Sequence, residues 1–220
     1  MSVVAKSTKS DTTKLRPLGR PPKRTDQKQR ILQTAAKSIA TIGFEQCSLA
    51  DIAADLDLTR PALYHYFSTK QQIFTEIALT AIIGMHEYVT SGVTASQTIE
   101  ASSAEQLRAL MQSHAEYFEN NYWIVNATIA GYGGIARREL ERIEEIDRCR
   151  DNYRDLLHQI LSEGRDNGEF RQLDIEAVGR SVFQLLNITR WYRPGGEKNA
   201  VDIASENFEL IIGGLAAKAY

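Results

Sequence analysis

The segment Phe44–Lys70 constrains the fold of this chain more than any other stretch of its sequence. Leu49, Ile52, Ala53 and Leu56 recur at the spacing i, i+3, i+4, i+7. Apolar residues at this spacing form one side of a short amphipathic helix. The segment therefore begins with a helix that needs a partner to cover its apolar side.

Residues that typically begin and end helices flank this pattern. Ser48 is placed to cap the free backbone amides of the first helix, and Asp51 is a possible capping-box partner. Asp57 interrupts the apolar pattern where a residue that tolerates left-handed backbone geometry is needed for a tight turn. Thr59 is a second N-cap, and Pro61 suits the first turn of the helix that follows.

The second helix carries an inward pair, Leu63 and Phe67, and a polar outer side. Two short helices joined by a tight turn predict a helix-turn-helix. The outer residues can hydrogen-bond to DNA bases and phosphates, which favours insertion into a major groove; they are Thr59, Arg60, Tyr64, His65 and Tyr66. A helical hairpin without a role in DNA binding remains the alternative.

The run D-I-A-A-D-L-D-L-T-R-P-A-L-Y-H-Y-F-S-T-K resembles the DNA-binding signature of the TetR family of bacterial transcriptional regulators, over about residues 26 to 74. The resemblance implies that Tyr64 and Lys70 bind phosphates and that residues near the start of the second helix contact bases. Asp57 stands where the family usually has Gly, and Tyr66 where it often has His. The predicted DNA-binding residues of this segment are Ser48, Thr59, Arg60, Pro61, Tyr64, His65, Tyr66 and Lys70.

Residues 1–24 predict a disordered basic arm, because they hold seven Lys or Arg, one acid and three prolines without periodicity. Arg20, Lys23 and Arg24 belong to a segment that resembles minor-groove hooks, so we expect them to contact DNA. A tail that only aids solubility is an equally open alternative. The charge balance agrees with DNA binding: residues 1–70 carry 12 Lys or Arg against 6 Asp or Glu, and residues 71–220 carry 14 against 22.

The remaining chain repeats the helical pattern, and nothing in it indicates a strand. We therefore expect an all-α protein with a helix-turn-helix domain over residues 25–70 and a helical ligand-binding and dimerisation domain over residues 71–220. The first helix should begin at Thr25 or Asp26 and end at Gly43. The later helices are expected at about 70–91, 104–120, 123–130, 136–164, 174–191 and from Asn199 onward, with a loop over 92–103.

Composition bounds the setting of the protein. Apolar residues make up 43% and charged residues 25% of the chain, no run of 18 apolar residues occurs, and the basic N-terminus lacks an apolar core. We expect a cytoplasmic protein with no membrane partner. Cys47 and Cys149 match no paired or metal-binding spacing, so two reduced structural thiols are favoured.

The last two helices carry more apolar surface than one inward side requires, which predicts a homodimer built on a four-helix bundle, as in the TetR family. The expected interface residues are Val182, Leu185, Phe208, Ile211 and Leu215. A deeper core within one chain is the alternative. A dimer would present two heads about 34 Å apart to a palindromic operator.

Aromatic and polar residues alternate on the middle helices, which is typical of small-molecule pockets. The candidate ligand residues are His114, Tyr117, Phe118, Trp123, Asn126, Phe183, Asn187 and Arg190. Residues 131–196 resemble, in patches, regulators of fatty-acid, sterol and aromatic-acid breakdown, whose effectors are often acyl-CoA thioesters. A small hydrophobic effector, with an acyl-CoA as one candidate, is therefore expected to release the protein from DNA.

Other functions remain as alternatives. A repressor of drug efflux with a broad hydrophobic pocket is the closest competitor, and a non-specific DNA binder would leave the large body unexplained. An enzyme is disfavoured, because the sequence has no phosphate-binding Gly-rich loop, no G-x-S-x-G and no H-E-x-x-H. We expect no catalytic residues, no metal site and no cofactor.

Overall fold

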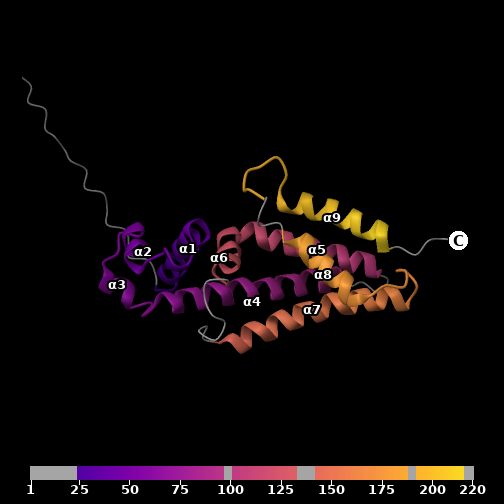
Figure 1. The fold of residues 1–220 in the computed structure, drawn as a ribbon, viewed down its shortest axis with the longest axis horizontal. Helices are drawn as coiled ribbons and strands as arrows, with labels where there is room; N and C mark the ends of the chain where they lie inside the picture. The colour runs from indigo at the N-terminus through magenta and orange to yellow at the C-terminus, as the bar shows by residue number, and fades with distance from the viewer. Residues whose placement is uncertain (1–23, 97–100, 133–141, 188–191, 216–220) are drawn as a thin grey trace, which may run out of the picture.

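The structure is a computed structural model that describes residues 24–96, 101–132, 142–187 and 192–215. Every regular element in these ranges is a helix, so the fold is all-α as predicted. The helices are α1 (Arg24–Ile42), α2 (Leu49–Asp55), α3 (Arg60–Tyr64), α4 (Lys70–Ser96), α5 (Ser103–Asn120), α6 (Tyr122–Tyr132), α7 (Ile143–Asp166), α8 (Ile175–Leu186) and α9 (Ala200–Leu215). Helices α1–α3 form a head at one end of an elongated molecule, and the others form a body (Figure 1).

The caps that the sequence predicts for the head are confirmed. The Ser48 hydroxyl oxygen accepts the backbone N–H of Asp51 at 3.2 Å, and the Thr59 hydroxyl oxygen accepts that of Ala62 at 3.3 Å. The Asp51 carboxylate accepts a hydrogen bond from the Ser48 hydroxyl at 2.5 Å. Asp57 lies in the left-handed region with φ 54°, as the turn between α2 and α3 requires. These local bonds fix where the two short helices begin.

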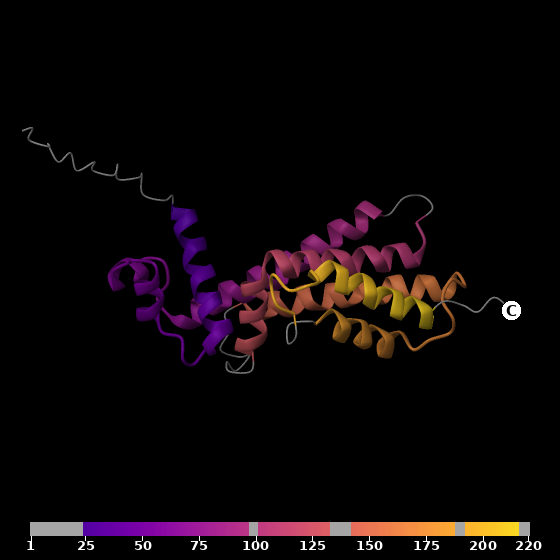
Figure 2. The ribbon, with the colours of Figure 1, turned by 90° about the horizontal axis from the view of Figure 1, so that it is seen from above.

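One apolar core joins the head to the first half of α4 and to α6. The predicted inward pair, Leu63 and Phe67, is buried, and it packs in the same cluster as Phe74 of α4 and Ile124 of α6. Helix α1 packs directly against α6 as well as α4, and the view from above shows α1 descending onto this joint (Figure 2). The head is therefore packed against the body and does not hang from a flexible linker.

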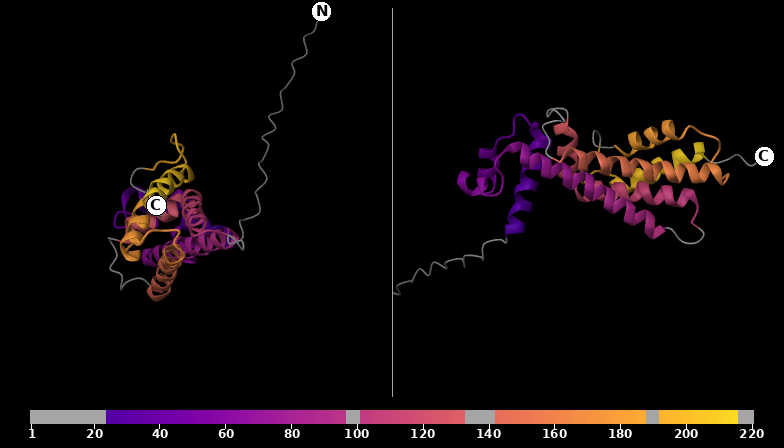
Figure 3. Two further views of the ribbon diagram at one scale, coloured as in Figure 1. Left: turned by 90° about the vertical axis from the view of Figure 1, so that its right-hand side faces the viewer. Right: turned by 90° about the horizontal axis from the view of Figure 1, so that it is seen from below.

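Helix α4 extends from the head along the body (Figure 3). It ends at Ser96, five residues beyond the predicted end at Ser91. Met85, Val89 and Val93 lie four residues apart and are all buried in the core of the body. Because Val93 continues this buried stripe, packing keeps the segment helical through residues that appear small and polar in sequence.

Three helices of the body, α5, α8 and α9, begin at residues whose side chains cap them. Ser102 forms a capping box with Glu105 at the start of α5, and Asp174 and Asn199 accept the backbone amides of Ala177 and Asp202 as predicted. Helix α8 ends at Leu186, earlier than the predicted Trp191, because Asn187 leaves helical geometry with ψ 70°. The predicted stretches 136–141 and 188–191 lie outside the described residues.

The burial of α8 and α9 corrects part of the expected dimer interface. Val182, Phe208 and Leu215 are 1%, 2% and 4% exposed within a single chain, so they belong to the core of the protomer. Leu185 and Ile211 are half-buried. The apolar side chain that α9 exposes most is Leu210, at 70%. Phe208 and Leu215 therefore lie on the inward side of α9, and the expected interface loses these two positions as well as Val182.

Within the described ranges, we find no helix that is both long enough and apolar enough to span a bilayer.

Candidate nucleic-acid interface and ligand cavity

Several predicted DNA-binding residues meet around one hollow of about 400 Å³ in the head. Helix α2 and its cap contribute Ser48, α3 contributes Arg60 and Tyr64, and α4 contributes Lys70. Tyr64 is 52% exposed, which is unusual for a side chain of this size, and it leaves an aromatic surface available to a partner. The capped turn thus presents hydroxyl, phenol and guanidinium groups together.

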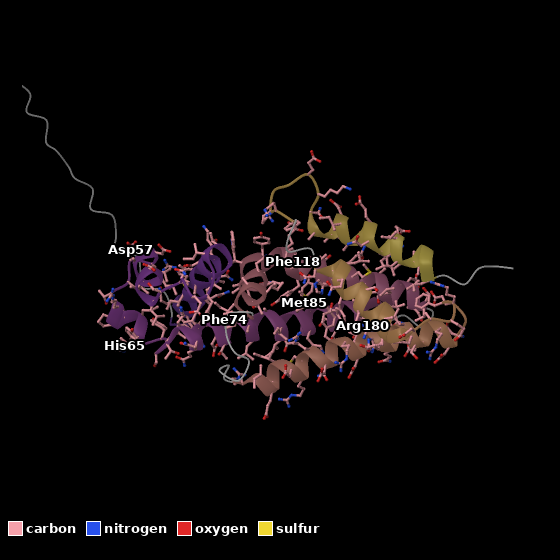
Figure 4. The ribbon with its side chains drawn as sticks, in the orientation of Figure 1. Asp57, His65, Phe74, Met85, Phe118 and Arg180 are labelled. Atoms are coloured by element: carbon pink, nitrogen blue, oxygen red, sulfur yellow. The ribbon has the colours of Figure 1, made fainter. Side chains whose placement is uncertain are left out.

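The other predicted residues lie on the same head with different exposure. Thr59, Pro61 and His65 are exposed, whereas Tyr66 is half-buried against the core of the head. Asp57 and His65 lie at the outer end of the head, far from the body (Figure 4). Arg20 and Lys23 fall outside the described residues, and Arg24 is the first residue of α1.

Lys70 has a structural role that the sequence did not indicate. Its ammonium donates hydrogen bonds to the carbonyl oxygens of Phe44 at 2.7 Å and Glu45 at 3.1 Å, and it lies 4.4 Å from the centre of the Phe44 ring. These contacts tie the start of α4 to the loop between α1 and α2. An ammonium has three N–H donors, so one donor remains for a phosphate. We expect Lys70 both to hold the head together and to contact DNA.

Replacing Lys70 with Ala is therefore expected to weaken binding to all DNA sequences to a similar extent. The slope of log affinity against log salt should fall by about one charge, because one phosphate contact is lost. Loss of the two carbonyl contacts should also lower the melting temperature. Titration of specific and random duplexes at several salt concentrations measures the first effect. Lys198→Ala, in the loop that precedes α9 in the body, is the control. If Lys70→Ala leaves the slope of log affinity against log salt unchanged, Lys70 does not contact a phosphate.

Arg60→Ala and Thr59→Ala are expected to change base preference instead. Both residues are exposed at the amino end of α3, where helix-turn-helix proteins contact base edges. Each lost base contact should reduce discrimination by roughly 1–3 kcal/mol. Selection of bound sequences from a random library measures this change. Retention of the wild-type consensus by both variants would show that neither side chain contacts bases.

A cavity of about 660 Å³ lies in the body between α4, α5, α6, α7 and α8. Its apolar surface includes Met85, Phe118, Val125, Phe183 and Leu186. Figure 4 shows Met85 and Phe118 in the body, further along the molecule than Phe74 at the joint with the head. The volume and the mainly apolar walls are typical of small-molecule sites.

Four predicted ligand residues line this cavity and three do not. His114, Phe118, Phe183 and Asn187 are among the lining residues. The Tyr117 hydroxyl donates to the Thr80 carbonyl at 2.7 Å on the α4 side, and the Asn126 amide donates to the Tyr122 carbonyl at 2.8 Å within α6. Trp123 is 37% exposed beside Lys37 of α1. These three residues are therefore corrected to structural positions, and Arg190 lies outside the described residues.

Sequence reasoning missed the contribution of α7 to the cavity. This helix adds Asp147, Arg150, Asp151 and Arg154, with Tyr153 beside them. The four charged residues are spaced i, i+3, i+4, i+7, so they form one side of α7. That spacing was visible in the sequence, but charged sides of helices usually face solvent alone. Only the packing of α7 against α8 and α4 shows that this side borders a cavity.

His114 and Tyr153 form a polar pair inside the cavity. The His114 Nδ1 atom and the Tyr153 hydroxyl oxygen are 2.7 Å apart, and the two rings stack with centroids 5.9 Å apart. Burial lowers the pKa of His114 to about 4 and raises the pKa of Tyr153 above its usual range. Both side chains are therefore uncharged at neutral pH.

A second chamber of about 360 Å³ adjoins the main cavity. Met85, Val125, Ile129, Arg150 and Tyr153 border both spaces, so the two are contiguous. The second chamber is mostly apolar and also contacts Cys149. In the part of the chain that the structure describes, no group of three or more His, Cys, Asp or Glu residues is placed to hold a metal ion.

Two family models match the chain in the two regions described above. Residues 31–77 match the model described as "Bacterial regulatory proteins, tetR family", and residues 100–215 match "Tetracyclin repressor-like, C-terminal domain". The repressor KstR2 of Mycolicibacterium smegmatis is 26% identical over 196 residues, which cover 86% of this chain and 90% of that protein.

Solved structures agree with this match. The TetR family regulator PfmR from Thermus thermophilus superposes with a TM-score of 0.76 and 34% identity, covering 86% of this chain and all of that one. AibR, whose structure is described as a complex with isovaleryl coenzyme A and operator DNA, superposes with a TM-score of 0.71 and 25% identity, covering 83% of this chain and 96% of that one.

Members of this family are non-enzymatic DNA-binding regulators of transcription. The family models together cover more than half of the chain, and the head with its helix-turn-helix and the all-helical body agree with them. The chain belongs to the TetR family of bacterial transcriptional regulators.

Proposed function

We propose that this regulator is a homodimeric repressor whose affinity for a palindromic operator is lowered by a small amphipathic effector in the main cavity. The observation that carries this proposal is the position of the cavity. Helices α4 and α6 both line it, and both pack against the head. An effector that shifts either helix would therefore move the head.

A series of close contacts connects the cavity to the DNA-facing hollow. Helix α6 contributes Ile129 to the cavity and, within the same turn, packs Gly131 against the Phe74 ring of α4. The Phe74 ring meets the Phe44 ring edge to face at 5.4 Å, and the Phe44 ring lies under the ammonium of Lys70. Lys70 borders the hollow that presents Arg60 and Tyr64.

The arginines at the rim of the cavity support an effector with an anionic end. Arg150 and Arg154 are exposed at the cavity, and Arg154 lies 3.0 Å from Asp151 in an ion pair near the solvent. Exposed ion pairs contribute little, so a phosphate group can replace the carboxylate at low cost. An acyl-CoA thioester combines an acyl chain suited to the cavity with phosphates suited to the rim, and AibR provides a related protein crystallised with such a ligand.

The mostly apolar second chamber supports a different effector class. A regulator of drug efflux would use such a chamber for hydrophobic cations, and Asp147 and Asp151 at the main cavity would offset their charge. This is the second candidate function. The two candidates differ in the sign of the charge that the effector places at the rim.

The outward side of α9 is the proposed dimer contact. Leu210 is 70% exposed, Ile211 and Ile212 are half-buried, and a Cβ atom built on Gly213 or Gly214 would meet nothing within 4 Å. An exposed apolar side with glycines that permit close approach fits a second copy of the chain. The carbonyl of Leu185 accepts a hydrogen bond from Asn207 at 3.0 Å, which fixes α8 beside α9.

A panel of acyl-CoA thioesters, their free acids and hydrophobic cations separates the two candidates. Each compound is titrated into the operator complex, and release is followed by fluorescence anisotropy. Release by thioesters alone supports the acyl-CoA effector, and release by unrelated cations supports the efflux candidate. Compounds that bind tightly without changing operator affinity would overturn the switch. The coupling between the two sites must be reciprocal. If the effector lowers the affinity for the operator tenfold, the operator lowers the affinity for the effector tenfold, a coupling free energy of about 1.4 kcal/mol.

Replacing Arg150 with Gln tests the rim directly. We expect affinity for a thioester to fall about tenfold, because a charge-assisted contact to phosphate is lost, whereas affinity for a hydrophobic cation should be unchanged or higher. Arg180→Gln is the matched control, since Arg180 is an exposed arginine of α8 that pairs with Glu176 and does not line the cavity. Equal effects of both variants on thioester binding would contradict a specific role for Arg150.

A further inference from the structure

The His114–Tyr153 pair is a hydrogen-bonded polar feature next to the apolar residues Phe118 and Phe183 of the main cavity. Each side chain is half-buried and lines the cavity, and they come from different helices, α5 and α7. The Tyr153 ring also packs edge to face on Phe183 of α8 at 5.3 Å. Three helices therefore hold the hydroxyl and the imidazole in place beside the space that an effector would occupy.

The pair retains one donor and one acceptor in either hydrogen-bonding arrangement. If the Tyr153 hydroxyl donates to His114 Nδ1, then Nε2–H is the remaining donor and the phenol oxygen is an acceptor. If Nδ1–H donates to the phenol oxygen, then the hydroxyl is the remaining donor and Nε2 is the acceptor. Both arrangements suit a carbonyl or hydroxyl group of a ligand.

The charge state of the pair selects against a carboxylate at this depth. His114 stays neutral because burial lowers its pKa to about 4. A carboxylate placed among Met85, Phe118 and Phe183 would lose its hydration without gaining a cation from the pair. Arg150 and Arg154 also border the cavity, but both are exposed. Anionic groups therefore suit the outer rim, and a neutral polar group suits the inner wall.

We propose that His114 and Tyr153 form a specificity element that binds an uncharged carbonyl or hydroxyl oxygen on the buried part of the effector. This inference rests on the proposed effector site and adds the chemical class of the group that the cavity selects. A purely aliphatic ligand would leave the donor and acceptor unpaired, which costs about tenfold or more in affinity. The oxygen comes from either of two sources, the thioester carbonyl itself or an oxygen on the acyl chain.

The test uses decanoate, decanoyl-CoA and 9-oxodecanoyl-CoA, measured by calorimetry on the full-length protein without DNA. If the pair binds an oxygen on the acyl chain, wild-type protein should bind 9-oxodecanoyl-CoA better than the other two ligands. If the pair binds the thioester carbonyl, both thioesters should bind better than decanoate. Tyr153→Phe keeps the ring contacts with Phe183 and removes the hydroxyl. If it weakens only 9-oxodecanoyl-CoA about tenfold, the chain oxygen binds the pair. If it weakens both thioesters equally and leaves decanoate unchanged, the thioester carbonyl binds the pair. Unchanged affinity for both thioesters would overturn the proposal.

Three further variants separate recognition from a structural role. His114→Gln retains a donor and an acceptor and should bind within a few-fold of wild type, whereas His114→Leu should lose the preference that Tyr153→Phe loses. Phe183→Leu alters the apolar wall and should weaken decanoate and both thioesters alike. Release of the operator is measured in a separate titration. If the thioesters bind with the expected preference but do not release the operator, the proposed function is contradicted and the specificity element is not. If Tyr153→Phe and His114→Leu release the operator at the same thioester concentrations as the wild type, the specificity element is contradicted and the proposed function is not.

Discussion

Replacing Leu210 with Asp is expected to convert the protein to a monomer and to reduce operator affinity at least about a hundredfold. A carboxylate in an apolar contact between two chains is desolvated without a partner, which costs several kcal/mol. Because Leu210 is 70% exposed in a single chain, the substitution should leave the folded protomer intact. A monomer offers one head, so it loses the combined binding of two half-sites.

Light scattering and circular dichroism measure the assembly and the helical content of this variant. Leu210→Met, which retains an apolar side chain, is the control and should remain dimeric. Phe208→Asp is not a suitable test, because Phe208 is 2% exposed in the protomer and beneath Arg108, so a charge there should unfold the chain. A Leu210→Asp protein that is still a folded dimer would show that the dimer uses another surface.

Replacing Gly131 with Ala is expected to destabilise the joint between head and body by about 1–3 kcal/mol, the usual cost of overpacking. An added Cβ atom would lie 2.1 Å from Cε2 and 2.5 Å from Cζ of Phe74. Phe74 is fully buried and contacts Phe44, so its ring has little room to move. We also expect altered operator affinity, because the displaced ring would shift the loop held by Lys70. Urea unfolding and operator titration measure the two effects.

Gly213→Ala is a control for the unfolding measurement only, because a Cβ atom there would meet nothing within 4 Å in its own chain but would enter the proposed dimer contact. Because alanine favours the helix, this change should be neutral or stabilise the protomer by up to about 1 kcal/mol. Phe74→Leu should relieve the clash, so the double variant Gly131→Ala/Phe74→Leu should be more stable than additivity predicts. Strictly additive losses of stability would show that Gly131 and Phe74 do not constrain each other.

The head was predictable because local interactions determine most of it. The caps at Ser48 and Thr59, the left-handed turn at Asp57 and the inward pair of Leu63 and Phe67 depend on residues close together in sequence. The cavity was predicted only in part. His114 and Phe118, which belong to the alternating set of aromatic and polar residues, line it, but Tyr117 of the same set faces α4 instead.

The sequence by itself determined the helical class, the helix boundaries set by capping residues, and the family of the protein. The helical class and these boundaries follow from periodicity and from hydrogen bonds between residues close together in sequence. The family follows from the resemblance of the helix-turn-helix segment. Only the tertiary structure decided which of several apolar sides is inward in α9 and which residues line the cavity. Phe208 fills the core while Leu210 remains exposed, and Tyr153 meets His114 across two helices. A helix with apolar residues on several sides has no local preference among them, so the packing of its neighbours makes that choice.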